Sequence, residues 1–328
     1  MDAERFYQIF TRLEAEVQKV IVGHDDVLSK VLIAFFAGGH VLLEGIPGLG
    51  KTLLVKTLSQ VLGISFKRIQ FTPDLMPSDI VGTQVLAENN GQRDFQFKKG
   101  PIFAHVVLAD EINRATPKTQ SAVLEAMEEK QVTVFGESYT LESPFMVLAT
   151  QNPIELEGTY PLPEAQLDRF FFKLLVTPPS PAELREILQR TTGAATTDAL
   201  KILGEDGEKI IKEMKQLLRQ VLIAPPIEEY VVRLVHATQP NSGNGGGPVT
   251  PVKQYLRFGS SPRGAQSLIL GAKGNALAEG RVHVSYADVE KVIYPALRHR
   301  IILNFQAEAE NVNADQILAE VIKKVPRA

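Results

Sequence analysis

Apolar residues recur at intervals of three and four near the start of the chain, and short, nearly continuous apolar runs follow. The first pattern predicts an amphipathic helix, with apolar positions at Phe6, Ile9, Phe10, Leu13, Val17 and Val20. The second pattern is typical of buried strands and covers residues 40–44, 65–71, 105–111, 145–151 and 170–176. Helix-length segments separate most of these runs, which predicts a parallel sheet covered by helices on both faces.

Two segments interrupt the alternation of strands and helices. Residues 71–103 predict a loop with a hairpin, and residues 131–141 alternate around Phe135-Gly136 as an exposed hairpin does. The helix between them is expected to begin at Pro117, with Thr116 as its cap.

Beyond the proline-rich stretch 176–181 the pattern becomes helical, apart from the Gly-rich segment 240–261, which predicts a mobile loop. The predicted helices cover residues 181–192, 207–222, 227–239, 263–280, 286–301 and 314–324. We therefore expect an α/β domain at 1–178 followed by a helical domain at 179–328.

Composition narrows the class of protein. A chain of 328 residues suits two domains, and a net charge of −3 gives no reason to expect a nucleic-acid partner. Cysteine is absent, which excludes disulfides and thiolate chemistry and fits a reducing cytoplasm. The acidic start does not resemble a secretion signal, and no apolar run reaches the roughly 18 residues of a membrane span. We expect a soluble cytoplasmic protein.

The stretch "GIPGLGKT" at 45–52 matches G-x-x-x-x-G-K-[ST] and lies between a predicted strand and a predicted helix. Its glycines let backbone N–H groups turn toward phosphates, Lys51 can reach the β and γ phosphates, and the Thr52 hydroxyl can bind Mg²⁺. The alternative is a Gly-Pro turn that only begins a helix. The predicted nucleotide-binding positions here are Gly45, Pro47, Gly48, Leu49, Gly50, Lys51, Thr52 and Leu53.

The run "HVVLADEINR" ends in two acids, Asp110 and Glu111, at the edge of the sheet where ligands bind in parallel sheets. Asp110 is the candidate to hold Mg²⁺, and Glu111 is the candidate general base for water. The alternative is a solvated pair of acids at a strand end. A base beside the phosphate site favours a hydrolase over a P-loop kinase, which must exclude water.

Four motifs in this order, "GIPGLGKT", "LADEINRA", "LATQNP" and "LPEAQLDRF", resemble the MoxR family of AAA+ ATPases over about residues 20–176. The stretch "SSPRGAQSL" gives weaker support further on. The resemblance implies a P-loop NTPase core with a five-stranded parallel sheet of order 5-1-4-3-2, an all-α lid, and a ring, usually a hexamer. It also implies kinship with magnesium-chelatase ATPase subunits, with a helix-2 insert at about 71–103 and a hairpin before the first sensor at about 131–141.

The resemblance also implies roles for single residues. Asn152 matches the first sensor, which orients the lytic water, although an Asn that ends a strand before proline needs no such role. Arg169 matches the arginine finger that reaches a neighbouring subunit's γ-phosphate; the alternative is a surface ion pair with Asp168. Arg263 matches the second sensor, a lid residue that contacts the γ-phosphate; the alternative is a helix-start arginine on a solvated face.

The family pattern also indicates roles for one short stretch and one further arginine. Val22, Gly23 and His24 lie where the family lines its adenine pocket with backbone and apolar contacts. Arg114 is shared with the family, and its role stays open.

The resemblance implies an ATPase, with ATP and Mg²⁺ bound, that remodels a protein client in a chaperone-like manner. Clients of the family often contain a von Willebrand factor A domain and receive a metal or cofactor. One alternative is a DNA-associated motor, against which the net charge and the acid at the tip of 131–141 both argue. Another is an assembly scaffold with little hydrolysis, against which the complete catalytic set argues. A small-molecule kinase needs neither a second domain nor the two late arginines.

Overall fold

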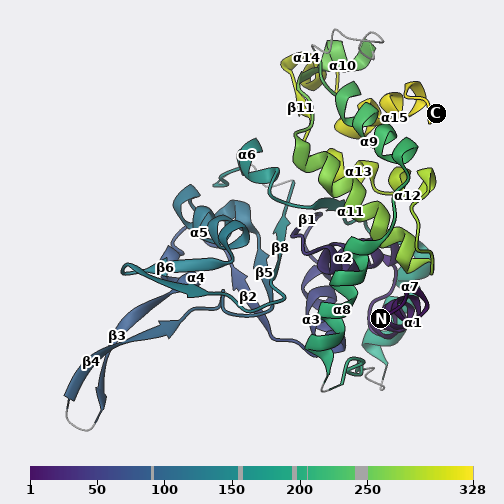
Figure 1. The fold of residues 1–328 in the computed structure, drawn as a ribbon. Helices are drawn as coiled ribbons and strands as arrows, with labels where there is room; N and C mark the ends of the chain where they lie inside the picture. Colours follow the sequence, from purple (N-terminus) through teal and green to yellow (C-terminus); the bar gives the residue numbers. More distant parts are fainter. Residues whose placement is uncertain (90–91, 154–157, 194–197, 205, 241–249, 328) are drawn as a thin grey trace.

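The computed structural model describes residues 1–89, 92–153, 158–193, 198–204, 206–240 and 250–327. Its strands are β1 (Val41–Glu44), β2 (Phe66–Gln70), β3 (Gly82–Asn89), β4 (Gln92–Lys99), β5 (Val106–Asp110), β6 (Gln131–Val134), β7 (Glu137–Thr140), β8 (Met146–Gln151), β9 (Phe172–Leu175), β10 (Leu256–Phe258) and β11 (Ile302–Leu303). Its helices are α1 (Ala3–Gln18), α2 (Asp25–Ala37), α3 (Lys51–Leu62), α4 (Pro77–Val81), the short η1 (Ile112–Arg114), α5 (Pro117–Glu129), α6 (Glu164–Leu167), α7 (Pro181–Thr192), α8 (Gly207–Gln220), α9 (Pro225–Ala237), α10 (Thr250–Tyr255), α11 (Pro262–Ala278), α12 (Tyr286–Glu290), α13 (Ile293–Leu297), α14 (Phe305–Ala309) and α15 (Ala314–Lys324). Figure 1 shows a part built on a sheet, with projecting hairpins, and a helical part beside it.

The central sheet has five parallel strands in the order β2-β5-β8-β1-β9. Counted along the chain, these are strands 2, 3, 4, 1 and 5 of the core. Read from the opposite edge of the sheet, this is the order 5-1-4-3-2, so the predicted order is confirmed. All five residues of β5 are buried, because helices cover both faces of the sheet.

Side chains of alternate strand residues divide the core into two layers. Leu42 packs on one face with α5, and its neighbours Val41 and Leu43 pack on the other with α1, α2 and α3. The second layer runs on through α2 into α8 and α11, and nine of the thirteen residues of α2 are buried. A helix that is apolar all round needs cover on every side. The helical part provides that cover, so sheet and helical parts share one apolar core.

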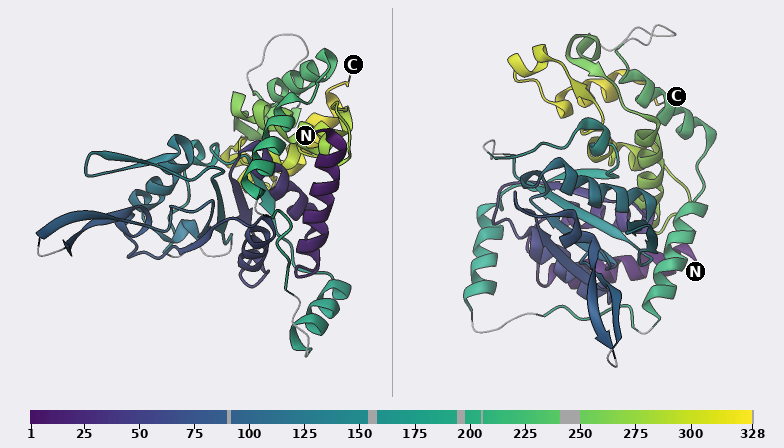
Figure 2. Two further views of the ribbon diagram at one scale, coloured as in Figure 1. Left: turned by 60° about the horizontal axis from the view of Figure 1, so that its bottom comes forward. Right: turned by 90° about the vertical axis from the view of Figure 1, so that its left-hand side faces the viewer.

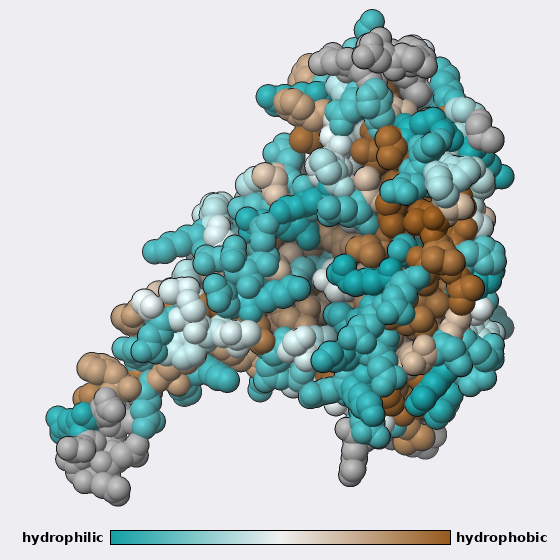
Figure 3. All heavy atoms as spheres, in the orientation of Figure 1, coloured by the Kyte–Doolittle hydropathy of each residue, from teal (hydrophilic) through white to brown (hydrophobic). Residues whose placement is uncertain are grey.

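Two hairpins project from the sheet edge on the side away from the helical part (Figures 1 and 2). The longer one pairs β3 with β4 from Gly82↔Lys99 to Asn89↔Gln92, and the shorter one pairs β6 with β7. The Phe97 ring on β4 stacks on the Tyr139 ring on β7 with centroids 4.1 Å apart, which joins the two hairpins. Leu86 and Phe95 remain exposed on the longer hairpin. This hairpin projects at the lower left of Figure 3.

Several local expectations were wrong. The helical part contains a small antiparallel pair, β10 with β11, whose two- and three-residue strands are too short to show a period. Residues 286–301 form α12 and α13 instead of one helix, because Pro295 lacks an N–H and its ring crowds the carbonyl of Lys291. Thr116 precedes α5 as expected, but its side chain makes no capping hydrogen bond.

The predicted Gly-rich loop agrees with the structure only in part. Residues 241–249 lie outside the described residues, whereas α10 and β10 occupy 250–258. Among the described residues, no helix is both long enough and apolar enough to cross a membrane. The division into domains at about residue 178 stays a prediction.

Candidate functional site

The phosphate-loop motif connects β1 to α3, and α3 begins at Lys51. Gly48 and Gly50 have φ values of +84° and +76°, in the left-handed region that favours glycine. A Cβ added to either glycine would meet nothing within 4 Å, so backbone conformation and not space requires glycine there. The Lys51 ammonium donates to the Gly45 carbonyl, and burial lowers the pKa of Lys51. The loop thus directs a cation and a helix N-terminus toward one point.

A cavity of about 360 Å³ lies between this loop and the carboxyl ends of β2, β5 and β8. It brings together residues that lie far apart in the sequence, from Pro47 to Asn152. Its lining residues are Pro47, Gly48, Gly50, Lys51, Thr52, Leu53, Arg68, Gln70, Asp110, Glu111 and Asn152. The structure therefore gathers Asn152 and the two acids around the phosphate loop, as the sequence predicted.

Asp110 is buried at the end of β5 and has partners on both neighbouring strands. Thr150 Oγ1 on β8 donates a 2.6 Å hydrogen bond to Asp110 Oδ1. Arg68 on β2 forms a charge-assisted contact with Asp110 Oδ2, at 2.7 Å from Nη2 and 3.0 Å from Nε. These contacts hold the carboxylate in one orientation.

Glu111 has a φ of +56°, an uncommon value for a residue with a side chain. Its backbone N–H donates to Thr150 Oγ1 at 2.8 Å, which holds the turn after β5 in place. Its Oε2 accepts a 3.0 Å hydrogen bond from Gln70 Nε2 and lies 3.2 Å from Nε of Arg114. The strained backbone therefore turns this carboxylate toward the cavity, between an amide and a guanidinium.

Arg68, Gln70 and Thr150 were not predicted from the sequence. Arg68 and Gln70 alternate along β2, so they share a face, and Gln70 lies in register with Asp110 on β5. A sequence signal for Arg68 and Gln70 does exist. They are polar residues two positions apart, at the carboxyl end of the strand that neighbours the strand carrying Asp110. Thr150 occupies the same level on β8 and is fully buried.

A second cavity, of about 210 Å³, adjoins the first and shares Gly48, Gly50 and Leu53 with it. Its remaining lining residues are Val20, Ile21, Val22, His24, Leu49, Pro179, Leu184, Ile187, Arg190 and Thr191. Val22 and Leu49 thus lie where a base would be expected. Gly23 does not line the cavity, because it packs against the Glu183 side chain. The contribution of α7 was missed, since its amphipathic pattern alone does not say what it covers.

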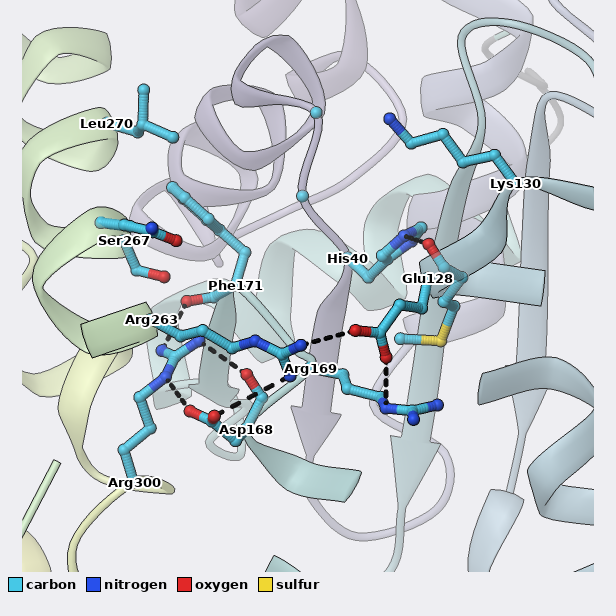
Figure 4. A pocket seen from close by; sticks show the side chains of 14 residues that line it. His40, Glu128, Lys130, Asp168, Arg169, Phe171, Arg263, Ser267, Leu270 and Arg300 are labelled. Atoms are coloured by element: carbon cyan, nitrogen blue, oxygen red, sulfur yellow. Dashed lines mark hydrogen bonds and ion pairs between the residues drawn. The ribbon is translucent and has the colours of Figure 1, made fainter. Parts of the chain in front are cut away.

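Arg169 and Arg263 line a different cavity, of about 220 Å³, between the sheet part and α11 (Figure 4). Arg169 pairs with Glu128 at 2.9 Å, not with Asp168 as the surface alternative supposed. Asp168 pairs with Arg300 at 2.9 Å. The structure places Arg263 beside Arg169 and not among the residues that line the cavity at the phosphate loop of the same chain. Its position follows from how α11 packs, which no local motif encodes. The role of Arg263 as the second sensor stays a prediction.

The residues around the phosphate loop fit a nucleotide with Mg²⁺. Lys51, Arg68 and the N-terminus of α3 supply positive charge at one end of the cavity. The Thr52 hydroxyl and the Asp110 carboxylate supply the hard oxygen ligands that Mg²⁺ prefers. The adjoining apolar cavity suits a flat base.

This fold and this cavity define a P-loop nucleotide-binding protein of the AAA+ class. Residues 40–172 match the family model described as "ATPase family associated with various cellular activities (AAA)", and residues 250–321 match the "AAA lid domain". The chain is 43% identical to "Chaperone MoxR1" of Mycobacterium tuberculosis over 310 residues, which is 94% of this chain and 80% of that protein. It is 32% identical to "Protein MoxR" of Methylorubrum extorquens over 324 residues, or 96% and 92% of the two chains.

The fold agrees as closely. A crystal structure from Cytophaga hutchinsonii superposes with a TM-score of 0.90 at 40% identity, covering 99% of this chain and 96% of that one. The chain belongs to the MoxR family of AAA+ ATPases.

Proposed function

We propose that the chain hydrolyses ATP to ADP and phosphate at a site shared between neighbouring subunits of a ring, with a hexamer as the expected size. One observation carries this proposal. Lys51, Thr52, Asp110, Glu111 and Asn152 line one cavity, whereas Arg169 and Arg263 line another. Two arginines away from their own phosphate loop can complete a site only on another subunit.

Each residue then has a defined task. Lys51 and the loop N–H groups bind the β and γ phosphates. Thr52 and Asp110 would hold Mg²⁺, which would neutralise charge on the phosphates. Glu111 takes a proton from the attacking water, and Asn152 orients that water. Arg169 and Arg263 of the neighbouring subunit stabilise charge on the γ-phosphate oxygens as the bond to the β-phosphate oxygen breaks.

Two variants test the shared site. The Glu111→Gln variant lacks the general base but still offers Arg169 and Arg263 to its neighbour. The Arg169→Ala variant keeps the general base Glu111 but lacks the arginine finger. Each alone should be inactive, and co-assembled rings should regain ATPase activity where an Arg169→Ala site faces a Glu111→Gln neighbour. The double variant in one chain is the control, because it cannot be complemented by Arg169→Ala. Mixed rings without activity, or normal turnover by Arg169→Ala alone, would contradict the shared site.

We further propose that hydrolysis drives chaperone-like remodelling of a protein client in the cytoplasm. The name of the mycobacterial relative, "Chaperone MoxR1", supports this class of work. A partner with a von Willebrand factor A domain, matured by insertion of a metal or cofactor, is the client class that we propose.

The client can be sought with a trapped protein. Glu111→Gln in ATP should retain its client in a pull-down, which mass spectrometry then identifies, and Lys51→Ala provides the nucleotide-free control. Equal capture by both variants would contradict an ATP-dependent client. DNA that binds in a salt-dependent way and stimulates turnover would instead favour the DNA-motor alternative.

A further inference from the structure

Glu128, at the end of α5, contacts both arginines of the second cavity through different oxygen atoms (Figure 4). Arg263 Nη2 donates a 2.6 Å hydrogen bond to Glu128 Oε1, and Arg169 Nε lies 2.9 Å from Glu128 Oε2. One carboxylate thus bridges a cation of the sheet part and a cation of the helical part.

Neighbouring contacts show that this bridge is specific. Asp168 is the other acid nearby, but it is engaged by Ser261 Oγ at 2.8 Å and by Arg300 Nε at 2.9 Å, and it lies 3.9 Å from Arg263. Arg169 has a second contact with the same helix, from Nη1 to the Leu124 carbonyl at 2.9 Å. Glu128 is therefore the acid that holds Arg263 closely.

The bridge lies within reach of another molecule. The side chains of Arg263, Arg169 and Glu128 are 44%, 33% and 37% exposed. Two long cations at one surface repel each other and sample many rotamers, and ordering them only as the transition state forms would raise its free energy. A carboxylate between them removes the repulsion and fixes both side chains beforehand.

We propose that Glu128 is a positioning residue that pairs Arg169 with Arg263, so that sheet part and lid present both to one terminal phosphate of the neighbouring subunit. This inference rests on the proposed shared site. The same contacts would couple the lid to the arginine finger. A shift of α11 would move Arg263, and Glu128 would transmit this movement to Arg169.

In the test, the Glu128→Gln substitution is made in one subunit, and ATP turnover is measured at the site of its neighbour. Rings are co-assembled from Arg169→Ala chains and from chains carrying Glu111→Gln with Glu128→Gln. Turnover then occurs only at the Arg169→Ala sites, whose own Glu128 is intact. We expect kcat to fall about fivefold relative to rings with Glu111→Gln alone, with KM for ATP unchanged, since a finger acts on the transition state. Glu129→Gln, one residue along α5, is the matched control, and Glu128→Asp should retain part of the activity.

A defect in folding can be separated from a defect in positioning. The Glu111→Gln, Glu128→Gln chain keeps its own phosphate loop, so it should bind a fluorescent ATP analogue as Glu111→Gln does. If kcat in the mixed rings equals that with Glu129→Gln, or rises above it, the positioning role is overturned. If rings with intact Glu128 fail to regain activity, the shared site itself fails, and this inference with it.

Discussion

Thr150 Oγ1 on β8 donates a 2.6 Å hydrogen bond to Asp110 Oδ1 on the neighbouring strand β5. The same oxygen accepts the backbone N–H of the following residue at 2.8 Å. One buried hydroxyl therefore orients the proposed magnesium ligand and the backbone of the proposed base together.

Thr150→Val keeps the shape of this side chain and removes both hydrogen bonds. Because second partners of a metal ligand set its orientation, we expect ATPase turnover to fall by about 10- to 100-fold. Nucleotide binding measured with EDTA should change little. Thr133→Val, at an exposed position on β6, is the matched control. Normal turnover by Thr150→Val would show that the orientation of Asp110 does not depend on this hydroxyl.

Gln70 Nε2 donates a 3.0 Å hydrogen bond to Glu111 Oε2. Gln70→Glu replaces this amide with a carboxylate and so places a like charge beside Glu111. The new carboxylate cannot donate the hydrogen bond that holds Glu111, and it repels that side chain from its place beside the cavity. We therefore expect kcat to fall further in Gln70→Glu than in Gln70→Ala, which removes the hydrogen bond without adding a charge. Steady-state ATPase assays measure both variants. Normal kcat in Gln70→Glu would argue against Glu111 as the base.

Gly23→Ala tests whether α7 helps to form the base pocket. A Cβ there would lie 2.6 Å from Glu183 Oε1, and the φ of +71° is already unfavourable for alanine. Glu183 belongs to the capping box of α7, so its displacement should loosen that helix. We expect KM for ATP to rise by about three- to tenfold with kcat unchanged. Gly280→Ala, with a φ of +73° but only ordinary contacts, is the control for backbone strain alone. If KM for ATP in Gly23→Ala equals that in Gly280→Ala, α7 does not contribute to nucleotide binding.

His40 predicts a dependence of stability on pH. Burial lowers its pKa to about 4, and the neutral ring accepts from Val147 N–H and donates to the Met127 carbonyl. Since the unfolded histidine binds a proton at higher pH, this contribution is complete above about pH 6.5 and is lost as pH falls toward 4. Between pH 7 and 5, the loss in the free energy of unfolding should be about 2 kcal/mol smaller in His40→Gln than in the wild type. Urea unfolding at both pH values measures it, with the exposed His236→Gln as control. Equal losses would contradict this role of His40.

The sequence predicted what local patterns encode. The phosphate loop, the acids after β5 and the strands themselves follow from spacing and from turns that need glycine, and the sheet order followed from the family resemblance. Arg68 and Gln70 were missed because alternating polar residues on an edge strand also suit a solvated face. The position of Arg263 depends on how α11 packs on α2, which is set by tertiary contacts and not by the residues around Arg263.

The stack of Phe97 on Tyr139 has a consequence for the sheet. The longer hairpin follows β2 through α4, and the shorter hairpin leads into β8. Since β2 and β8 flank β5, the stacked rings join hairpins that are continuous with both neighbours of the strand carrying Asp110. The same two strands supply Arg68 and Thr150, whose hydrogen bonds hold the Asp110 carboxylate, so the hairpins and this carboxylate belong to one connected set of contacts.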